Sequence, residues 1–435
     1  MIQPFLTVNV RLAESKGLMP TTPRESLSQR PVPAQASGQP DSYAKKALLA
    51  SAVGYAMDGF DLLILGFILS AVSAGLHLSA GQAGSLVTGT LLGAVIGGLV
   101  FGVLSDYVGR IKVLSWTILL FAIFTGLCAL SRGYWDLLAY RTIAGIGLGG
   151  EFGIGMALAA EAWPANMRAR VSSYVGLGWQ SGVLAAAVVT PILLPHIGWR
   201  GMFAVGLLPA LVSFVMRRTI GEPEIFVERS RAPREGMPVW LLVKDAATTK
   251  ISLGMFILCS VQNFGYFGLM IWLPTYLSRQ FGYTLTRSAV WTGVTVIGMC
   301  CGIWTFGQLA DRVGRRPVFF AFQAGAAIMV IVYANLTTPV ALLIGGAVMG
   351  AFVNGMLGGY GALMSELYPT QARATAQNVL FNLGRAVGGF GPLVVGTLAV
   401  RYSFHLTIAL LAVIYVIDIL ATALLIPERK GVALE

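Results

Sequence analysis

The sequence has few charged residues, and this scarcity excludes an ordinary soluble protein. Asp, Glu, Lys and Arg make up 11% of the 435 residues, whereas soluble domains contain about a quarter. Hydrophobic residues reach 56%, and the chain has 53 glycines, as expected where membrane helices approach one another closely. The composition therefore indicates a protein that crosses a membrane many times.

Residues suited to metal, haem or covalent chemistry are also scarce. The four cysteines lie in apolar runs without C-x-x-C spacing, and the three histidines form no cluster, so neither a disulfide framework nor a metal site is indicated. A G-x-G-x-x-G pattern at Gly145–Gly150 lies inside an apolar run with no preceding strand, so it does not indicate a dinucleotide site. We expect no cofactor and no enzymatic activity.

The net charge is +11, but the distribution of Lys and Arg along the chain indicates membrane topology and not a nucleic-acid partner. Lys and Arg concentrate in every second loop, which by the positive-inside rule puts both termini in the cytoplasm. Of the 30 Lys and Arg residues, only seven lie elsewhere: Arg132, Arg200, Arg279, Arg287 and Arg401 in outer loops, and Arg141 and Arg385 inside helices.

Apolar segments long enough to cross about 30 Å of hydrocarbon as helices recur from Lys46 onward. Residues 1–44 are polar and rich in Pro, Ser and Gln, which predicts a disordered cytoplasmic tail. The charged stretch 221–248 predicts a cytoplasmic linker between domains 45–220 and 249–427, with a short cytoplasmic tail at 428–435. We predict an all-α fold with twelve transmembrane helices, at 47–74, 82–105, 111–131, 134–161, 169–194, 199–219, 249–279, 286–310, 316–336, 340–366, 373–400 and 403–426.

An internal repeat relates the two predicted domains. Gly102–Arg110 recurs as Gly307–Arg315, and Glu161–Arg168 recurs as Glu366–Arg373, both at an offset of 205 residues. One offset that serves separate segments indicates two homologous six-helix units.

In these loops the sequence resembles the major facilitator superfamily, whose most specific signature is G-x-L-[SA]-D-x-x-G-R. The resemblance covers about residues 45–427 and implies two bundles around a central cavity that opens alternately to either side. In that superfamily the Asp and Arg of the loop bridge neighbouring helices and stabilise one of the two forms. The alternative for the second copy is ordinary loop charge. The resemblance implies gating roles for Asp106, Arg110, Asp311 and Arg315.

Ionisable side chains inside the predicted helices are the main functional candidates, because each costs several kcal/mol unless it is paired or lines water. Asp58 and Asp61 are three residues apart and share one helix face. Two poorly solvated carboxylates repel each other when both are ionised, which favours a proton on one of them. The pair therefore predicts proton coupling, and the alternative is that one Asp merely neutralises an Arg.

Arg141 and Glu151 share the predicted fourth helix, about 15 Å apart along its axis, so each needs a separate partner. Asp58 or Asp61 is the candidate partner for either. D-G-F-D in the first helix, together with G-G-E in the fourth, resembles the aromatic acid:proton symporter family and its relatives that carry sialic acid and sugar acids. That resemblance implies roles in proton coupling and substrate binding for Asp58, Asp61 and Glu151. R-x-x-x-G-x-G-x-G on the fourth helix, which the superfamily associates with proton coupling, adds Arg141.

Arg385 on the predicted eleventh helix is the candidate anchor for an anionic substrate, because its planar guanidinium matches a carboxylate. The alternative is a position near the cytoplasmic end, against backbone or lipid phosphate. Asp418 on the last helix has no motif context and receives no role. Further substrate-binding candidates are the polar and aromatic residues Trp179, Gln180, Gln262, Asn263, Tyr266, Asn354, Tyr360 and Asn382.

We therefore expect a secondary active transporter of a bacterial inner membrane that takes up a small organic acid together with protons and works as a monomer in the bilayer. Aromatic, muconate-like, sugar and sialic acids all suit one Arg with amide and aromatic neighbours. Proton-driven efflux is the alternative, but Gly176–Gly182 lacks the Gly-Pro motif of the superfamily's drug:proton antiporters. A membrane sensor is a third possibility, although the tail and linker contain no recognisable signalling domain. The offset takes Asp58 to Asn263 and Arg385 back to Gln180, so the N-terminal half is expected to hold the proton machinery.

Overall fold

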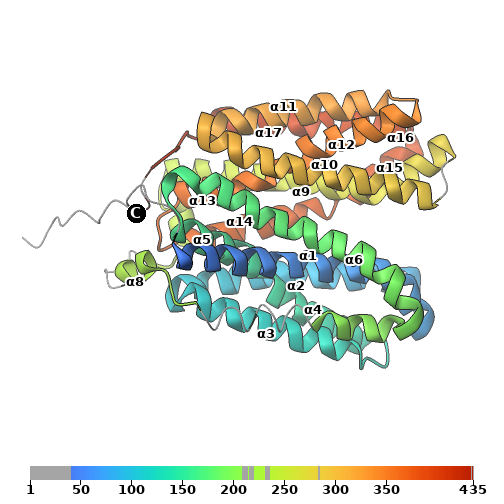
Figure 1. The fold of residues 1–435 in the computed structure, drawn as a ribbon, viewed down its shortest axis with the longest axis horizontal. Helices are drawn as coiled ribbons and strands as arrows, with labels where there is room; N and C mark the ends of the chain where they lie inside the picture. The colour runs from blue at the N-terminus through green and yellow to red at the C-terminus, as the bar shows by residue number, and fades with distance from the viewer. Residues whose placement is uncertain are drawn as a thin grey trace, which may run out of the picture. The chain divides into compact units, whose positions relative to one another are not determined.

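The computed structural model describes residues 41–207, 214, 220–230, 236–282, 285–432 and 434, and these residues are almost entirely helical (Figure 1). Most of the predicted disordered tail and most of the predicted sixth helix lie outside the described residues. Within them, 11 helices are long and apolar enough to cross a membrane. The all-α membrane fold is confirmed.

The N-terminal half contains the predicted first to fifth helices in order. A break at Gly150 divides the predicted fourth helix into α4 and α5. Gly198 has a φ of 65°, and this kink separates the predicted fifth and sixth helices inside one continuous element, α6. The bounds are α1 (Ser42–Leu76), α2 (Ala80–Val108), α3 (Arg110–Cys128), α4 (Tyr134–Gly149), α5 (Glu151–Ala162) and α6 (Arg168–Val205), followed by the short α8 (Glu224–Ser230).

The C-terminal half repeats this order. Its predicted tenth, eleventh and twelfth helices are each divided in two by a short break, as the predicted fourth helix is. The bounds are α9 (Ala246–Phe281), α10 (Leu285–Val313), α11 (Arg315–Ala334), α12 (Pro339–Gly355), α13 (Leu357–Leu367), α14 (Arg373–Gly388), α15 (Gly391–Arg401), α16 (Phe404–Leu410) and α17 (Ala412–Leu425).

Helix packing follows the sequence repeat. In the first half α2 packs along α4, and in the second half α10 packs along α12. Glycines make this approach possible: a Cβ at Gly97 would lie 1.8 Å from the carbonyl oxygen of Ile146, and one at Gly302 would lie 2.0 Å from that of Ala351. These two glycines are related by the offset of 205, so the same close contact is built twice.

The two halves meet mainly where α14 packs on α2 and on α5, and where α6 packs on α10 and on α13. A Cβ at Gly102 on α2 would lie 2.9 Å from the Cβ of Asn378 on α14, and one at Gly307 on α10 would lie 2.2 Å from the Oγ of Ser173 on α6. These positions lie toward the end of the molecule that carries α8 and the start of α1 (Figure 1). We call this end the linker end.

The close glycine contacts predict a sharp difference between two substitutions on α2. Gly97→Ala should destabilise the protein by about 1–3 kcal/mol, because the added methyl group has no room beside the Ile146 carbonyl. Thermal unfolding in detergent measures the loss. Gly84→Ala is the matched control, since nothing lies within 4 Å of its added Cβ. Equal melting temperatures for the two variants would contradict the packing described here.

Candidate functional site

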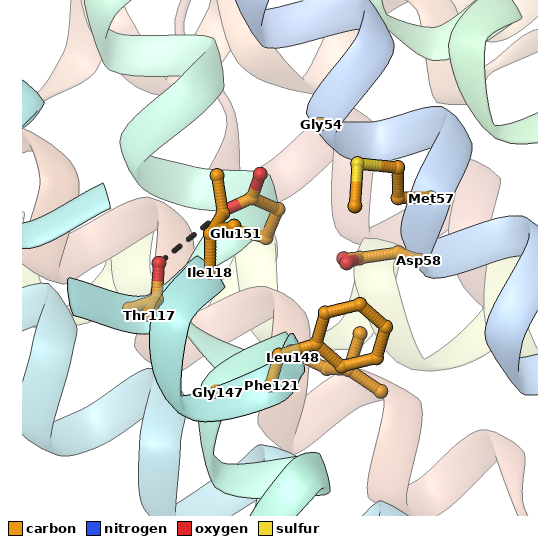
Figure 2. Close-up of a pocket in the computed structure, with 9 residues that line it drawn as sticks. All are labelled: Gly54, Met57, Asp58, Thr117, Ile118, Phe121, Gly147, Leu148 and Glu151. Atoms are coloured by element: carbon orange, nitrogen blue, oxygen red, sulfur yellow. Dashed lines mark hydrogen bonds between the residues drawn. The ribbon is translucent and has the colours of Figure 1, made fainter. Parts of the chain in front are cut away.

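A cavity inside the N-terminal half brings together two of the predicted coupling residues. Asp58 on α1 and Glu151 on α5 are both buried and both line this space, which has an empty volume of about 180 Å³ (Figure 2). Residues of α3 and α4 complete the wall, with Thr117, Phe121 and Gly147 among them. We call this space the acid cavity.

Arg141 and Asp61 form a buried bidentate ion pair beside these residues. The Arg141 Nη1 atom lies 3.0 Å from Asp61 Oδ1, and Nη2 lies 2.8 Å from Oδ2. Arg141 Nε also donates to the Thr90 hydroxyl at 3.3 Å, and the Thr125 hydroxyl lies 3.5 Å from Asp61 Oδ1. The expectation that Arg141 and Glu151 need different partners therefore agrees with the geometry.

The structure separates the two aspartates that the sequence grouped together. Asp61 neutralises Arg141, which is the alternative interpretation of the aspartate pair. Asp58 instead shares the acid cavity with Glu151. Any repulsion between carboxylates that favours proton binding therefore acts between helices α1 and α5, rather than along α1.

A second cavity lies between the two halves and has an empty volume of about 250 Å³. We call it the central cavity. Six predicted substrate-binding candidates line it: Trp179 of the N-terminal half and Gln262, Asn263, Tyr266, Asn354 and Arg385 of the C-terminal half. The remaining lining residues are Tyr55 from the N-terminal half and Phe267, Leu357 and Phe381 from the C-terminal half.

Arg385 is held between aromatic rings in the central cavity. Its guanidinium carbon lies 5.4 Å from the ring centre of Trp179 and 5.2 Å from that of Phe381, distances typical of cation–π contacts. Phe381 in turn stacks on Phe152 with ring centres 3.7 Å apart. Arg385 is therefore buried in the cavity, whereas its alternative interpretation placed it near the cytoplasmic end, against backbone or lipid phosphate.

Two hydrogen bonds join side chains that line the central cavity. The Trp179 indole N–H lies 3.3 Å from the Tyr266 hydroxyl, a bond that joins the two halves across the cavity. The Gln262 amide donates to Asn354 Oδ1 at 2.6 Å. Sequence reasoning missed Tyr55 and Phe381, although Tyr55 precedes Asp58 by about one helical turn and Phe381 precedes Arg385 by one.

Three predicted substrate-binding residues are not among those that line the central cavity. The Tyr360 hydroxyl donates to the Leu258 carbonyl at 2.9 Å, and the Asn382 amide donates to the Gly149 carbonyl at 2.9 Å. The Gln180 amide lies 3.6 Å from the Met299 sulfur. Their side chains join neighbouring helices, because the rotation of each helix about its axis turns them away from the cavity.

The first predicted gating pair takes part in a buried network at the linker end. Asp106 lies 2.7 Å from Arg110, and Arg110 lies 3.0 Å from Glu161. Glu161 also binds Arg373 of the other half at 2.8 Å. Asp106 accepts hydrogen bonds from the backbone N–H and the hydroxyl of Thr375 at 2.8 and 2.6 Å, in the first turn of α14. The N-terminal half is therefore tied to the start of a C-terminal helix.

The second gating pair repeats this arrangement in the opposite direction. Asp311 lies 3.1 Å from Arg315, which binds Glu366 at 2.7 Å. Asp311 accepts from the backbone N–H groups of Ala169 and Arg170, each at 3.1 Å, in the first turn of α6. The second copy is therefore buried and joins the two halves, which simple loop charge does not explain. We call the two networks together the latch.

Asp418, which received no role from the sequence, is fully buried on α17. Neither carboxylate oxygen makes a hydrogen bond of good geometry among the described residues, and a polar neighbour of the carboxyl is Gln323. A carboxyl group in an otherwise apolar helix was the available signal, and the sequence offered no motif with which to interpret it.

Comparisons with known proteins agree with this geometry. The chain matches the family model of the Major Facilitator Superfamily over residues 51–310 and 291–434. A Haemophilus influenzae protein named for metabolite transport is 66% identical over 91% of this chain and 99% of its own length. The cis,cis-muconate transport protein of Acinetobacter baylyi is 30% identical over 89% and 95%. The solved structure of the proton:xylose symporter XylE with bound 6-bromo-6-deoxy-D-glucose is similar with a TM-score of 0.76 over 90% of this chain and 98% of that one, at 19% identity, and it shows the fold alone.

The latch geometry predicts unequal effects of removing its two glutamates. Glu161→Gln should cost about 3–5 kcal/mol of stability, because it leaves two buried guanidinium groups without their shared carboxylate. Glu366→Gln should cost less stability, because Arg168 lies 3.9 Å from Glu366 and its ion pair with that carboxylate is therefore weaker. Thermal unfolding in detergent measures both losses, with the exposed Glu228→Gln as the control. A larger loss for Glu366→Gln would be inconsistent with this network.

Proposed function

Because the chain belongs to the Major Facilitator Superfamily, we propose that this multi-pass transport protein couples the uptake of a small organic acid to the entry of protons by alternating access. The protein is a transporter of that superfamily and not an enzyme. The observation that carries the proposal is the buried Arg385 in the central cavity, held between Trp179 and Phe381.

Three features of the central cavity support an anionic substrate. The Arg385 guanidinium is a permanent cation with a planar fork that matches a carboxylate. The aromatic rings beside it offer faces against which a flat or unsaturated acid could pack. Gln262, Asn263 and Asn354 supply amide groups for further polar contacts. The name of the muconate transport protein among the relatives agrees with an organic acid.

The acid cavity supports a proton site next to the substrate. Asp58 lies three residues after Tyr55 on α1, and Glu151 directly precedes Phe152 on α5. Tyr55 lines the central cavity, and Phe152 stacks on Phe381. Each carboxyl group is thus about one helical turn or less from a residue that lines the central cavity or stacks on its wall. A change in the charge of Asp58 or Glu151 can therefore affect that wall. In this proposal Asp58 and Glu151 bind and release the proton, while Asp61 remains paired with Arg141.

The latch supports alternating access. Its contacts join the halves at the linker end, and the positive-inside distribution of Lys and Arg supports a cytoplasmic location for that end and for both termini. A bacterial inner membrane and domains at 45–220 and 249–427 belong to the same proposal. Opening the linker end would require Asp106 and Asp311 to leave the first turns of α14 and α6.

Transport in proteoliposomes tests the proposed direction and coupling. With an inward proton gradient, radiolabelled benzoate-type acids or sugar acids should accumulate, and a protonophore should collapse that accumulation. Protonophore-insensitive accumulation would contradict symport. Substrate loss from preloaded vesicles under the opposite gradient would favour the efflux alternative.

Substitutions separate the substrate role from the proton role. Arg385→Gln should raise the KM for the acid tenfold or more, a loss of about 1.4 kcal/mol or more, while the exposed Arg401→Gln should leave it unchanged. Asp58→Asn and Glu151→Gln should abolish accumulation driven by the pH gradient but keep substrate exchange across the membrane. If both variants keep pH-driven accumulation, the proposed proton site is wrong.

A further inference from the structure

The outer helix α3 carries a buried polar stripe, and the proposed function does not use the two threonines in it. Trp116 and Ile123 on this helix are exposed, as expected of a surface toward lipid, whereas Arg110, Thr117 and Thr125 on the opposite side are 0% exposed. Ser and Thr are common where membrane helices pack together, and a buried hydroxyl is expected to have a hydrogen-bond partner. The partners of these two threonines therefore indicate what the stripe does.

Each of these hydroxyls meets a carboxylate of the proposed proton machinery. The Thr117 Oγ1 atom lies 3.4 Å from Glu151 Oε2 on the wall of the acid cavity (Figure 2). The Thr125 Oγ1 atom lies 3.5 Å from Asp61 Oδ1. Both contacts are longer than an ordinary O–H···O hydrogen bond, so neither is fully formed in this conformation.

Thr117 has a second acceptor for its only proton. Its hydroxyl lies 2.9 Å from the Leu114 carbonyl oxygen, nearer than it lies to Glu151. A hydroxyl group donates one hydrogen bond at a time. The hydroxyl can therefore donate to Glu151 when that carboxyl is ionised, and can return to Leu114 when Glu151 carries a proton and needs no donor.

The same helix begins in the latch. Arg110 is the first residue of α3, and its guanidinium donates to the Thr370 carbonyl of the other half at 2.8 Å. Arg110 also binds Glu161 of α5, so α3 and α5 are joined twice, by Arg110 to Glu161 and by Thr117 to Glu151. The seven residues from Arg110 to Thr117 span about 10 Å of helix.

We propose that Thr117 and Thr125 are positioning residues for Glu151 and Asp61, and that α3 thereby transmits the protonation of the acid cavity to the latch. The inference rests on the proposed proton coupling. The other charged or titratable groups near the two carboxyls include Asp58 of α1 in the acid cavity, Arg141 of α4 on Asp61, Cys128 of α3, and Tyr55 of α1, whose ring packs on Phe152. The remaining neighbours of α5 include Asn378 of α14 and Phe101 of α2, close to Gly153 and Gly150, and these are uncharged.

The pH profile of uptake tests the positioning role. Thr117→Val removes the hydroxyl at nearly constant volume, so the ionised form of Glu151 loses a donor and the midpoint of uptake should move to higher pH by about half a unit or more. Thr125→Val should produce a smaller shift, because Arg141 already holds Asp61. Thr117→Ser, which keeps the hydroxyl, should restore the wild-type midpoint, and the exposed Thr88→Val should not move it.

A double-mutant cycle distinguishes positioning from a structural defect. In the Glu151→Gln background, substrate exchange should be the same with Thr117 or Val, because the carboxylate that the hydroxyl serves is gone. A Thr117→Val variant that lowers the rate equally at every pH, without moving the midpoint, would overturn the proposal. If the wild-type protein shows no pH-driven uptake at all, the proposed function itself fails, and that outcome is visible before any variant is made.

Hydrogen exchange tests the connection to the latch. The backbone N–H of Thr375 donates to Asp106 in the closed latch, so its protection factor, the intrinsic exchange rate at each pH divided by the observed rate, reports opening of the linker end. In the wild-type protein, lowering the pH from about 8 to about 6, the range in which the uptake midpoint is sought, should change this protection factor. In Thr117→Val the change should be reduced at least severalfold. The same pH response in both proteins would exclude transmission through α3.

Discussion

Two carboxylates at the linker end determine how the halves of this protein meet. Asp106 binds the first turn of α14, and Asp311 binds the first turn of α6, so each half places an anion at the positive end of a helix dipole in the other half. Lipid tails are as apolar as the helix surfaces, so hydrophobic burial contributes little to helix association inside a membrane. Polar contacts of this kind therefore carry much of the attachment between the halves.

The two cavities depend on that attachment. With the halves joined at the linker end, Tyr55 and Trp179 of one half face Arg385 of the other across the central cavity. The acid cavity lies within the N-terminal half, and α1 supplies residues to both cavities, Asp58 to the acid cavity and Tyr55 to the central cavity. The proposed coupling therefore needs no long pathway, since the proton site and the substrate site use neighbouring residues of the same helices.

The internal repeat distinguishes structural features, which occur in both halves, from the proposed transport residues, which occur in one. The glycine contacts of α2 with α4 recur between α10 and α12, and the Asp–Arg–Glu network recurs in both copies of the latch. The charged residues in and beside the acid cavity do not recur: Arg141 corresponds to Gly346 and Glu151 to Met356. One copy of the latch is also tighter, since Arg373 binds Glu161 at 2.8 Å while Arg168 lies 3.9 Å from Glu366.

The resemblance to the superfamily singled out Asp106, Arg110, Asp311 and Arg315, and the sequence by itself determined the all-α membrane fold and the repeated order of helices. These properties depend on the length and polarity of continuous segments and on a repeat at one offset, all of which can be read along the chain. Only the tertiary structure decided that Asp61 pairs with Arg141 while Asp58 faces Glu151, and that Arg385 faces the central cavity while Gln180, Tyr360 and Asn382 join helices. The physical reason is helix rotation. Residues on uniformly apolar helices have no hydrophobic stripe to reveal which side faces the protein, so only packing against neighbouring helices determines where each polar side chain points.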